Sequence, residues 1–168
     1  MQNKILNQRV NFIDLWKIRS DELYRAAKVV WDSEVIDHSN DGDDDRLKIH
    51  LQYRPATLLM GLSLETMLKA CIIANRPISL GKDYPKDLSH HKLIDLYKLA
   101  GFCPSELEVS FLNHLTASIE WTSKYPTPIR ESSYKTDALI RNEGHFITFS
   151  VLHGNILKKF PTHAPQTP

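Results

Sequence analysis

The chain has few of the residues that stabilise small secreted proteins or bind metals. Its 168 residues include two cysteines, Cys71 and Cys103, and six glycines. Two cysteines among apolar neighbours are too few for a disulfide framework, so we expect reduced thiols in a cytoplasmic protein. The sequence contains no CxxC pair and no HExxH motif, and we therefore expect no metal site and no cofactor.

Long apolar runs and an excess of one charge are missing too. Lys and Arg number 21 against 20 Asp and Glu, a formal net charge of +1. This balance excludes a protein that coats nucleic acid through overall positive charge, but it is compatible with a local basic patch. No stretch approaches the roughly 18–20 apolar residues of a membrane span, and the first ten residues contain no apolar run. We expect a soluble protein without a membrane partner.

Motifs of phosphate-binding loops and serine nucleophiles are also absent. The sequence has no GxxxxGK[ST], GxGxxG or GxSxG. Residues 37–45 match the early positions of a calcium-binding loop, but Lys48 occupies the twelfth position, where such a loop needs a bidentate Glu. A solvated, mobile acidic loop is the better interpretation.

What the chain does contain is helical periodicity. Apolar residues recur at helical spacing over five segments, at about 12–33, 54–75, 91–100, 105–124 and 145–160. No run has the alternation and β-branched enrichment of a strand. The sequence therefore predicts an all-α protein, a single up-and-down bundle of about five helices. Residues 1–160 are expected to form one domain and residues 161–168 a flexible tail.

Local signals predict several helix ends. Pro55 is tolerated in the first turn of a helix and is expected to open the second segment. Gly101 is a typical C-terminal signal for the third segment. Ser105 and Glu108 stand in capping-box register at the start of the fourth.

The expected core follows from the same periodicity. Segment 54–75 is apolar nearly all round, which is typical of a helix in the middle of a bundle. In the fourth segment, the residues expected to face the core are Leu107, Phe111, Leu115, Ile119 and Thr122, which form its predicted inner stripe. In the fifth segment they are Phe149, Leu152, Ile156 and Phe160.

Glu65 and Lys69 interrupt the apolar second segment. They are four residues apart, in the Glu-before-Lys order that favours pairing on a helix. Charges within an apolar face must be paired, because an unpaired buried charge costs several kcal/mol. Two interpretations stay open: an ion pair that buttresses the bundle, and a polar pocket for an anionic or nucleotide-like ligand.

Two further groups of polar residues lie near predicted helix ends. His91 and Lys92 begin the third segment, and Lys124 and Tyr125 end the fourth. Cations near a helix start can hold a phosphate, and a tyrosine ring can stack on a base. Each group by itself is more typical of an ordinary surface.

Three short motifs follow one another along the chain: Gly61-Leu62-Ser63-Leu64-Glu65-Thr66-Met67-Leu68-Lys69-Ala70, His91-Lys92-Leu93 and Lys124-Tyr125-Pro126. Together they resemble the motifs of the HEPN superfamily (higher eukaryote and prokaryote nucleotide-binding domain). The resemblance covers about residues 50–128. It implies a homodimeric helical bundle that binds RNA, a nucleotide or a partner protein, often in toxin–antitoxin, defence or stress modules, with an antitoxin-like protein as one such partner. The ligand-binding residues would be Glu65, Lys69, His91, Lys124 and Tyr125.

Ribonucleases of this superfamily carry an Arg followed, after four to six residues, by a His. Here the nearest pairs, Arg46 with His50 and Arg141 with His145, have three intervening residues. This departure favours a protein that is not catalytic. The enzyme alternative is a divergent, metal-independent ribonuclease toxin, in which His145 is the general acid or base and Arg141 stabilises the phosphorane charge. A structural adaptor that binds another protein is the third hypothesis.

Overall fold

The computed structural model describes residues 9–33, 45–77, 85–122 and 144–160. Its helices are α2 (Ile13–Ser33), α3 (Asp45–Asn75), α4 (Leu93–Leu99), α5 (Glu106–Ala117) and α6 (Gly144–Lys158), with a 3₁₀ turn, η1 (Lys86–Leu88), and a π-helical turn, η2 (Ser118–Thr122). No strand occurs among these residues, so the predicted all-α bundle is confirmed. Residues 37–44 of the predicted acidic loop, the predicted tail, Lys124, Tyr125 and Arg141 lie outside the described residues.

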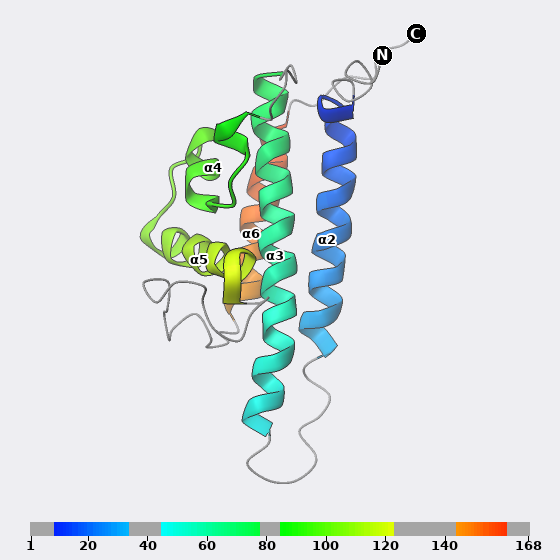
Figure 1. The fold of residues 1–168 in the computed structure, drawn as a ribbon, viewed down its shortest axis with the longest axis vertical. Coiled ribbons are helices and arrows are strands. Elements are labelled where there is room, and N and C mark those ends of the chain that lie inside the picture. The colour runs from blue at the N-terminus through cyan, green and yellow to red at the C-terminus, as the bar shows by residue number, and fades with distance from the viewer. Residues whose placement is uncertain (1–8, 34–44, 78–84, 123–143, 161–168) are drawn as a thin grey trace.

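Helix α3 lies in the middle of the bundle, as predicted. Helix α2 runs along one side of it, α4 and α5 lie on the opposite side, and α6 lies behind it (Figure 1). Met60, Leu64 and Leu68 on α3 are fully buried. Residues Tyr53–Asn75 are long and apolar enough to cross a membrane, but 78% of their most apolar window is buried inside the bundle, as expected for a core helix.

The start of α3 differs from the prediction. The helix begins at Asp45, and Pro55 lies inside it instead of opening it. Proline in a helix removes one N–H donor and crowds the carbonyl four residues earlier, but its own ring faces outward here. Thr57 Oγ1 donates a hydrogen bond to the Arg54 carbonyl at 3.1 Å in the same turn. The helix continues through Pro55, whose ring lies on its exposed side.

The predicted signals around α4 and α5 are confirmed. Gly101 has φ +81°, and the Phe102 N–H donates to the Tyr97 carbonyl at 3.1 Å, the bond of a Schellman cap. The Tyr97 and Phe102 rings stack across this cap with centroids 4.6 Å apart. Ser105 and Glu108 form the predicted capping box at the start of α5.

The predicted inner stripe of α5 is wrong at one position. Phe111, Leu115 and Ile119 are buried, but Leu107 is 72% exposed. Helix α5 crosses α3 at a steep angle, so its first turn projects beyond the surface that α3 covers (Figure 1). The predicted core positions of α6, Phe149, Leu152 and Ile156, are buried, and so is Phe160 just after the helix.

Gly61 allows α3 to approach the α5–η2 junction closely. A Cβ at this position would lie 2.8 Å from Ile119 Cγ1 and 3.1 Å from the Leu115 carbonyl oxygen, both in the core. We expect Gly61→Ala to lower the free energy of unfolding by about 1–2 kcal/mol, because overpacking outweighs the higher helix propensity of alanine.

Gly154 on α6 is the matched control, because a Cβ built there meets no atom within 4 Å apart from its chain neighbours and the backbone of its own helix. Gly154→Ala is expected to raise the unfolding free energy by up to about 1 kcal/mol. Urea unfolding of both variants measures these changes. Equal effects of the two substitutions would contradict the close packing at Gly61.

Candidate functional site

Three of the predicted ligand-binding residues meet between α3 and the start of α4. Lys69 Nζ donates to Glu65 Oε1 at 2.6 Å, and His91 Nδ1 lies 2.9 Å from Glu65 Oε2. The side chains of Glu65 and Lys69 are 10% and 11% exposed, whereas that of His91 is 49% exposed. Each oxygen of the buried carboxylate therefore has its own partner, and the network opens to solvent at the His91 ring.

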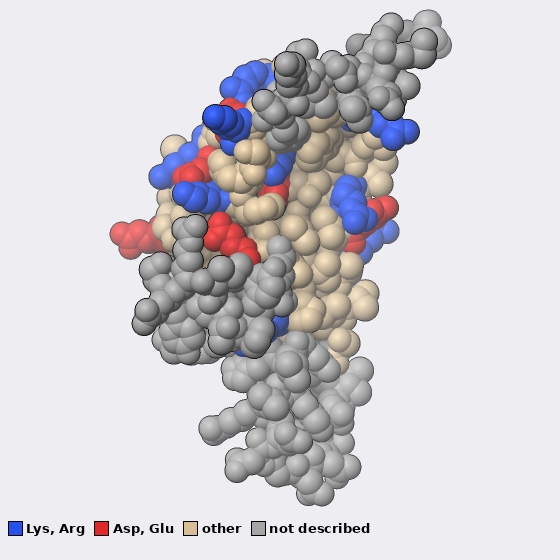
Figure 2. Space-filling model, viewed as in Figure 1, with Lys and Arg blue, Asp and Glu red and all other residues tan. Residues whose placement is uncertain are grey.

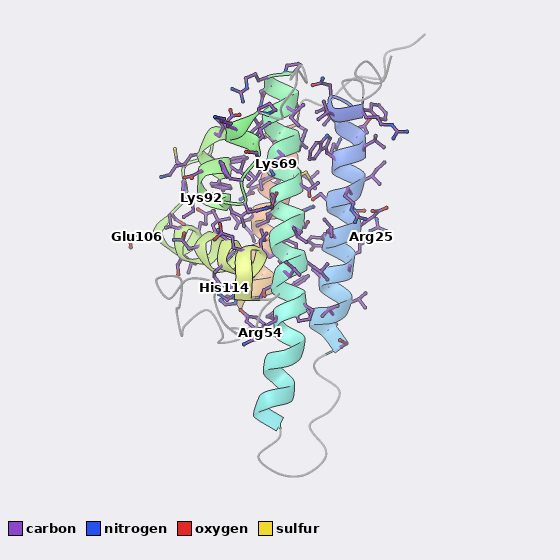
Figure 3. The ribbon with its side chains drawn as sticks, viewed as in Figure 1. Arg25, Arg54, Lys69, Lys92, Glu106 and His114 are labelled. Atoms are coloured by element: carbon purple, nitrogen blue, oxygen red, sulfur yellow. The ribbon has the colours of Figure 1, made fainter. Side chains whose placement is uncertain are left out.

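The position of His91 follows from the packing of α4. Leu93, the first residue of α4, is fully buried, and its backbone N–H donates to Thr116 Oγ1 of α5 at 3.1 Å. Lys92 precedes it and is exposed, and its backbone N–H donates to His90 Nδ1 at 3.2 Å. Anchoring Leu93 in the core thus places His91 over Glu65 and leaves Lys92 in solvent beside it. Figure 3 labels Lys69 on α3 and Lys92 just before α4.

This arrangement bears on both interpretations of Glu65 and Lys69. Their short contact, at low exposure, makes them an ion pair within the bundle, because burial of either charge alone would be costly. The same carboxylate fixes the orientation of a half-exposed imidazole. A ligand can reach the His91 ring and Lys92, whereas Glu65 and Lys69 act on such a ligand only through His91.

A second cluster joins α3, α5 and α6, and sequence reasoning missed most of it. The Tyr53 hydroxyl lies 2.8 Å from His114 Nε2 and 2.5 Å from His145 Nδ1. The two imidazole centroids are 5.0 Å apart, and Phe111 packs on His145 at 5.3 Å. His145 lies in the first turn of α6, and its ring is packed inside this cluster. Figure 3 labels His114, beside α3.

Burial determines the protonation of this cluster. Burial lowers the pKa of His114 to about 4, with a smaller contribution from the nearby His145, and burial also lowers the pKa of His145. Both rings are therefore neutral at pH 7. Since the Tyr53 hydroxyl has one hydrogen, it donates to one of the two rings at most, and at least one ring donates an N–H to it. The far nitrogen of that neutral ring is then a bare proton acceptor.

A third polar group lies where α2, α3 and α6 meet. Ser20 Oγ donates to the Ser63 carbonyl at 2.9 Å, and Ser63 Oγ donates to the Ser20 carbonyl at the same distance. His153 Nε2 lies 3.2 Å from Ser20 Oγ, whose hydrogen is already donated to a carbonyl. The imidazole therefore donates its Nε2–H, and Ser20 is no activated nucleophile. This group satisfies buried polar atoms between close-packed helices.

Within the described part of the chain, no group of three or more His, Cys, Asp or Glu side chains is placed to hold a metal ion. Comparison with protein-family models, curated proteins and solved structures finds no significant match. The HEPN resemblance therefore rests on the motif residues of the sequence itself.

Proposed function

We propose that this protein is a HEPN-like, homodimeric helical-bundle domain that binds the phosphate groups of RNA or of a nucleotide at the surface formed by His91 and Lys92. The observation that carries the proposal is the fixed orientation of a half-exposed imidazole by a buried carboxylate, next to an exposed lysine. Phosphate is bound by such donors when they converge on one surface. Lys124 and Tyr125 are proposed to add a cation and a stacking ring.

The biological setting belongs to the proposal as well. The motif resemblance points to a toxin–antitoxin, defence or stress module, with an antitoxin-like protein as a further partner. Neither is needed for the phosphate contact itself, which depends on the charges at the start of α4.

A mobility-shift assay with a labelled mixed RNA pool in EDTA tests the proposal. The wild-type protein is expected to shift RNA, and the double substitution His91→Ala with Lys92→Ala is expected to weaken binding by about tenfold. Lys98→Ala is the matched control, because Lys98 is an exposed lysine at the other end of α4. No shift by the wild type, or an equal shift by the double variant, would contradict the proposal and favour a protein-binding adaptor.

The second candidate function is metal-independent RNA cleavage at Tyr53, His114 and His145. Its support is the pair of neutral imidazoles linked by one hydroxyl, since a neutral imidazole is the form that accepts a proton from a 2′-OH. Arg141 would stabilise the developing phosphorane charge in this mechanism.

The same incubation in EDTA, resolved on a denaturing gel, tests this candidate. Cleavage lost in both His145→Ala and His114→Ala would support it. Intact RNA after prolonged incubation with the wild type, or cleavage that survives both substitutions, would exclude this cluster as the catalytic centre.

A further inference from the structure

The outer face of α2 has the pattern of a helix–helix seam. Leu15, Ile18, Glu22, Arg25 and Val29 follow one another at spacings of three and four residues. Leu15, Ile18 and Val29 are 46%, 56% and 68% exposed, unusual for apolar side chains on one face of one helix. Spacings of three and four are those of the a and d positions of a coiled coil.

The opposite face of α2 is buried in the bundle. Ser20 and Ala27, at the position opposite the seam, are fully buried against α3. Tyr24 stacks on Phe149 of α6 with centroids 5.0 Å apart. Figure 1 shows α2 at the edge of the molecule, and Figure 3 shows Arg25 on the side that faces away from α3. The seam is therefore a second face that the described part of the chain leaves uncovered.

The charges of the seam indicate what covers it. Glu22 and Arg25 lie at its centre, and their side chains are 58% and 78% exposed. On this edge of the molecule, acidic and basic side chains lie between stretches of uncharged surface (Figure 2). A second copy packed in parallel would place Glu22 opposite Glu22 and Arg25 opposite Arg25, which is unfavourable.

An antiparallel second copy gives the complementary result. In the a-against-d register of antiparallel helices, Ile18 packs against Val29 of the other copy and Glu22 meets its Arg25. The flanking Asp21 of one copy then also lies across the seam from Lys28 of the other copy. Because the two-fold axis repeats every contact, each of these attractive pairs occurs twice.

We propose that α2 forms the homodimer interface, by antiparallel packing of its Ile18–Val29 face on the same face of a second copy. The inference extends the homodimer of the proposed function, and because its test contains no RNA, its failure and a failure of RNA binding are separate results.

Sedimentation equilibrium over a wide range of protein concentration tests the interface. The wild type is expected to be dimeric, and Ile18→Glu and Val29→Glu should each raise the dimer dissociation constant by about tenfold or more, since each buries a charge at the seam. Leu107→Glu, on the exposed start of α5, is the matched control and should leave it unchanged. A monomeric wild type, or a dimer insensitive to both seam substitutions, would overturn the proposal.

A charge exchange tests the orientation with surface residues that folding does not need. Glu22→Arg should weaken the dimer by about tenfold, because it puts like charges opposite each other, and adding Arg25→Glu should restore the wild-type dissociation constant. In a parallel dimer the single exchange only replaces one like-charge pair by another. A dimer unaffected by Glu22→Arg would therefore overturn the antiparallel arrangement.

Discussion

Lys69→Met is expected to lower the free energy of unfolding by about 3–5 kcal/mol. The substitution keeps the length and apolar stem of the side chain but removes the charge that holds Glu65 Oε1 at 2.6 Å. Since the Glu65 side chain is only 10% exposed, water cannot replace the lost partner, and His91 contacts only the other oxygen. Urea unfolding followed by circular dichroism measures the loss.

The double variant Glu65→Leu with Lys69→Met is the control for this prediction. Removing both charges leaves no ion buried alone, so the double variant should be more stable than Lys69→Met by itself. If the losses of unfolding free energy caused by Glu65→Leu and by Lys69→Met simply add in the double variant, the result contradicts a coupled buried pair. An unchanged stability of Lys69→Met, together with lost RNA binding, would favour the pocket interpretation of these residues.

Acid is expected to destabilise the fold between about pH 6.5 and pH 4. Burial lowers the pKa values of His114, His145 and His153 in the folded protein, and that of His114 reaches about 4 against an ordinary value of 6.5. In this window the unfolded chain binds more protons than the folded one, so the unfolding free energy falls as pH falls. His114 alone accounts for up to about 3 kcal/mol, and the other two act in the same direction.

Unfolding free energies measured across this pH range, in the wild type and in His114→Gln, check the prediction. Glutamine retains a side-chain hydrogen-bonding group but does not titrate, so the variant should lose less stability between pH 6.5 and pH 4 even if it is less stable at pH 7. An identical pH dependence in the two proteins would show that His114 does not carry the effect.

The helices and their caps could be predicted because their signals are local. Ser105 with Glu108, and Gly101 after Ala100, act within a few residues, and the structure has both caps where the sequence puts them. Periodicity identified α3 as the central helix for the same reason. The start of α3 was mispredicted because a proline with an exposed ring can also lie inside a helix, which the local rule for Pro55 does not foresee.

The candidate site was predictable only in part. Glu65 and Lys69 stood out as charges on an apolar helix, and His91 as a polar residue at a predicted helix start and in the motif resemblance. The contact of Tyr53 with His114 and His145 joins residues 61 and 92 positions apart, and nothing local marks it. The exposure of Leu107 likewise depends on the angle at which α5 crosses α3, which periodicity does not specify.

The salt dependence of RNA binding tests the central claim most directly. Fluorescence anisotropy with a labelled RNA, repeated over a series of salt concentrations, gives the slope of the logarithm of the binding constant against the logarithm of salt concentration. The account predicts a negative slope for the wild type that becomes shallower by about one in Lys92→Ala and is unchanged in Lys98→Ala. A slope that Lys92→Ala leaves unaltered, or binding that does not respond to salt, would contradict phosphate recognition at the start of α4.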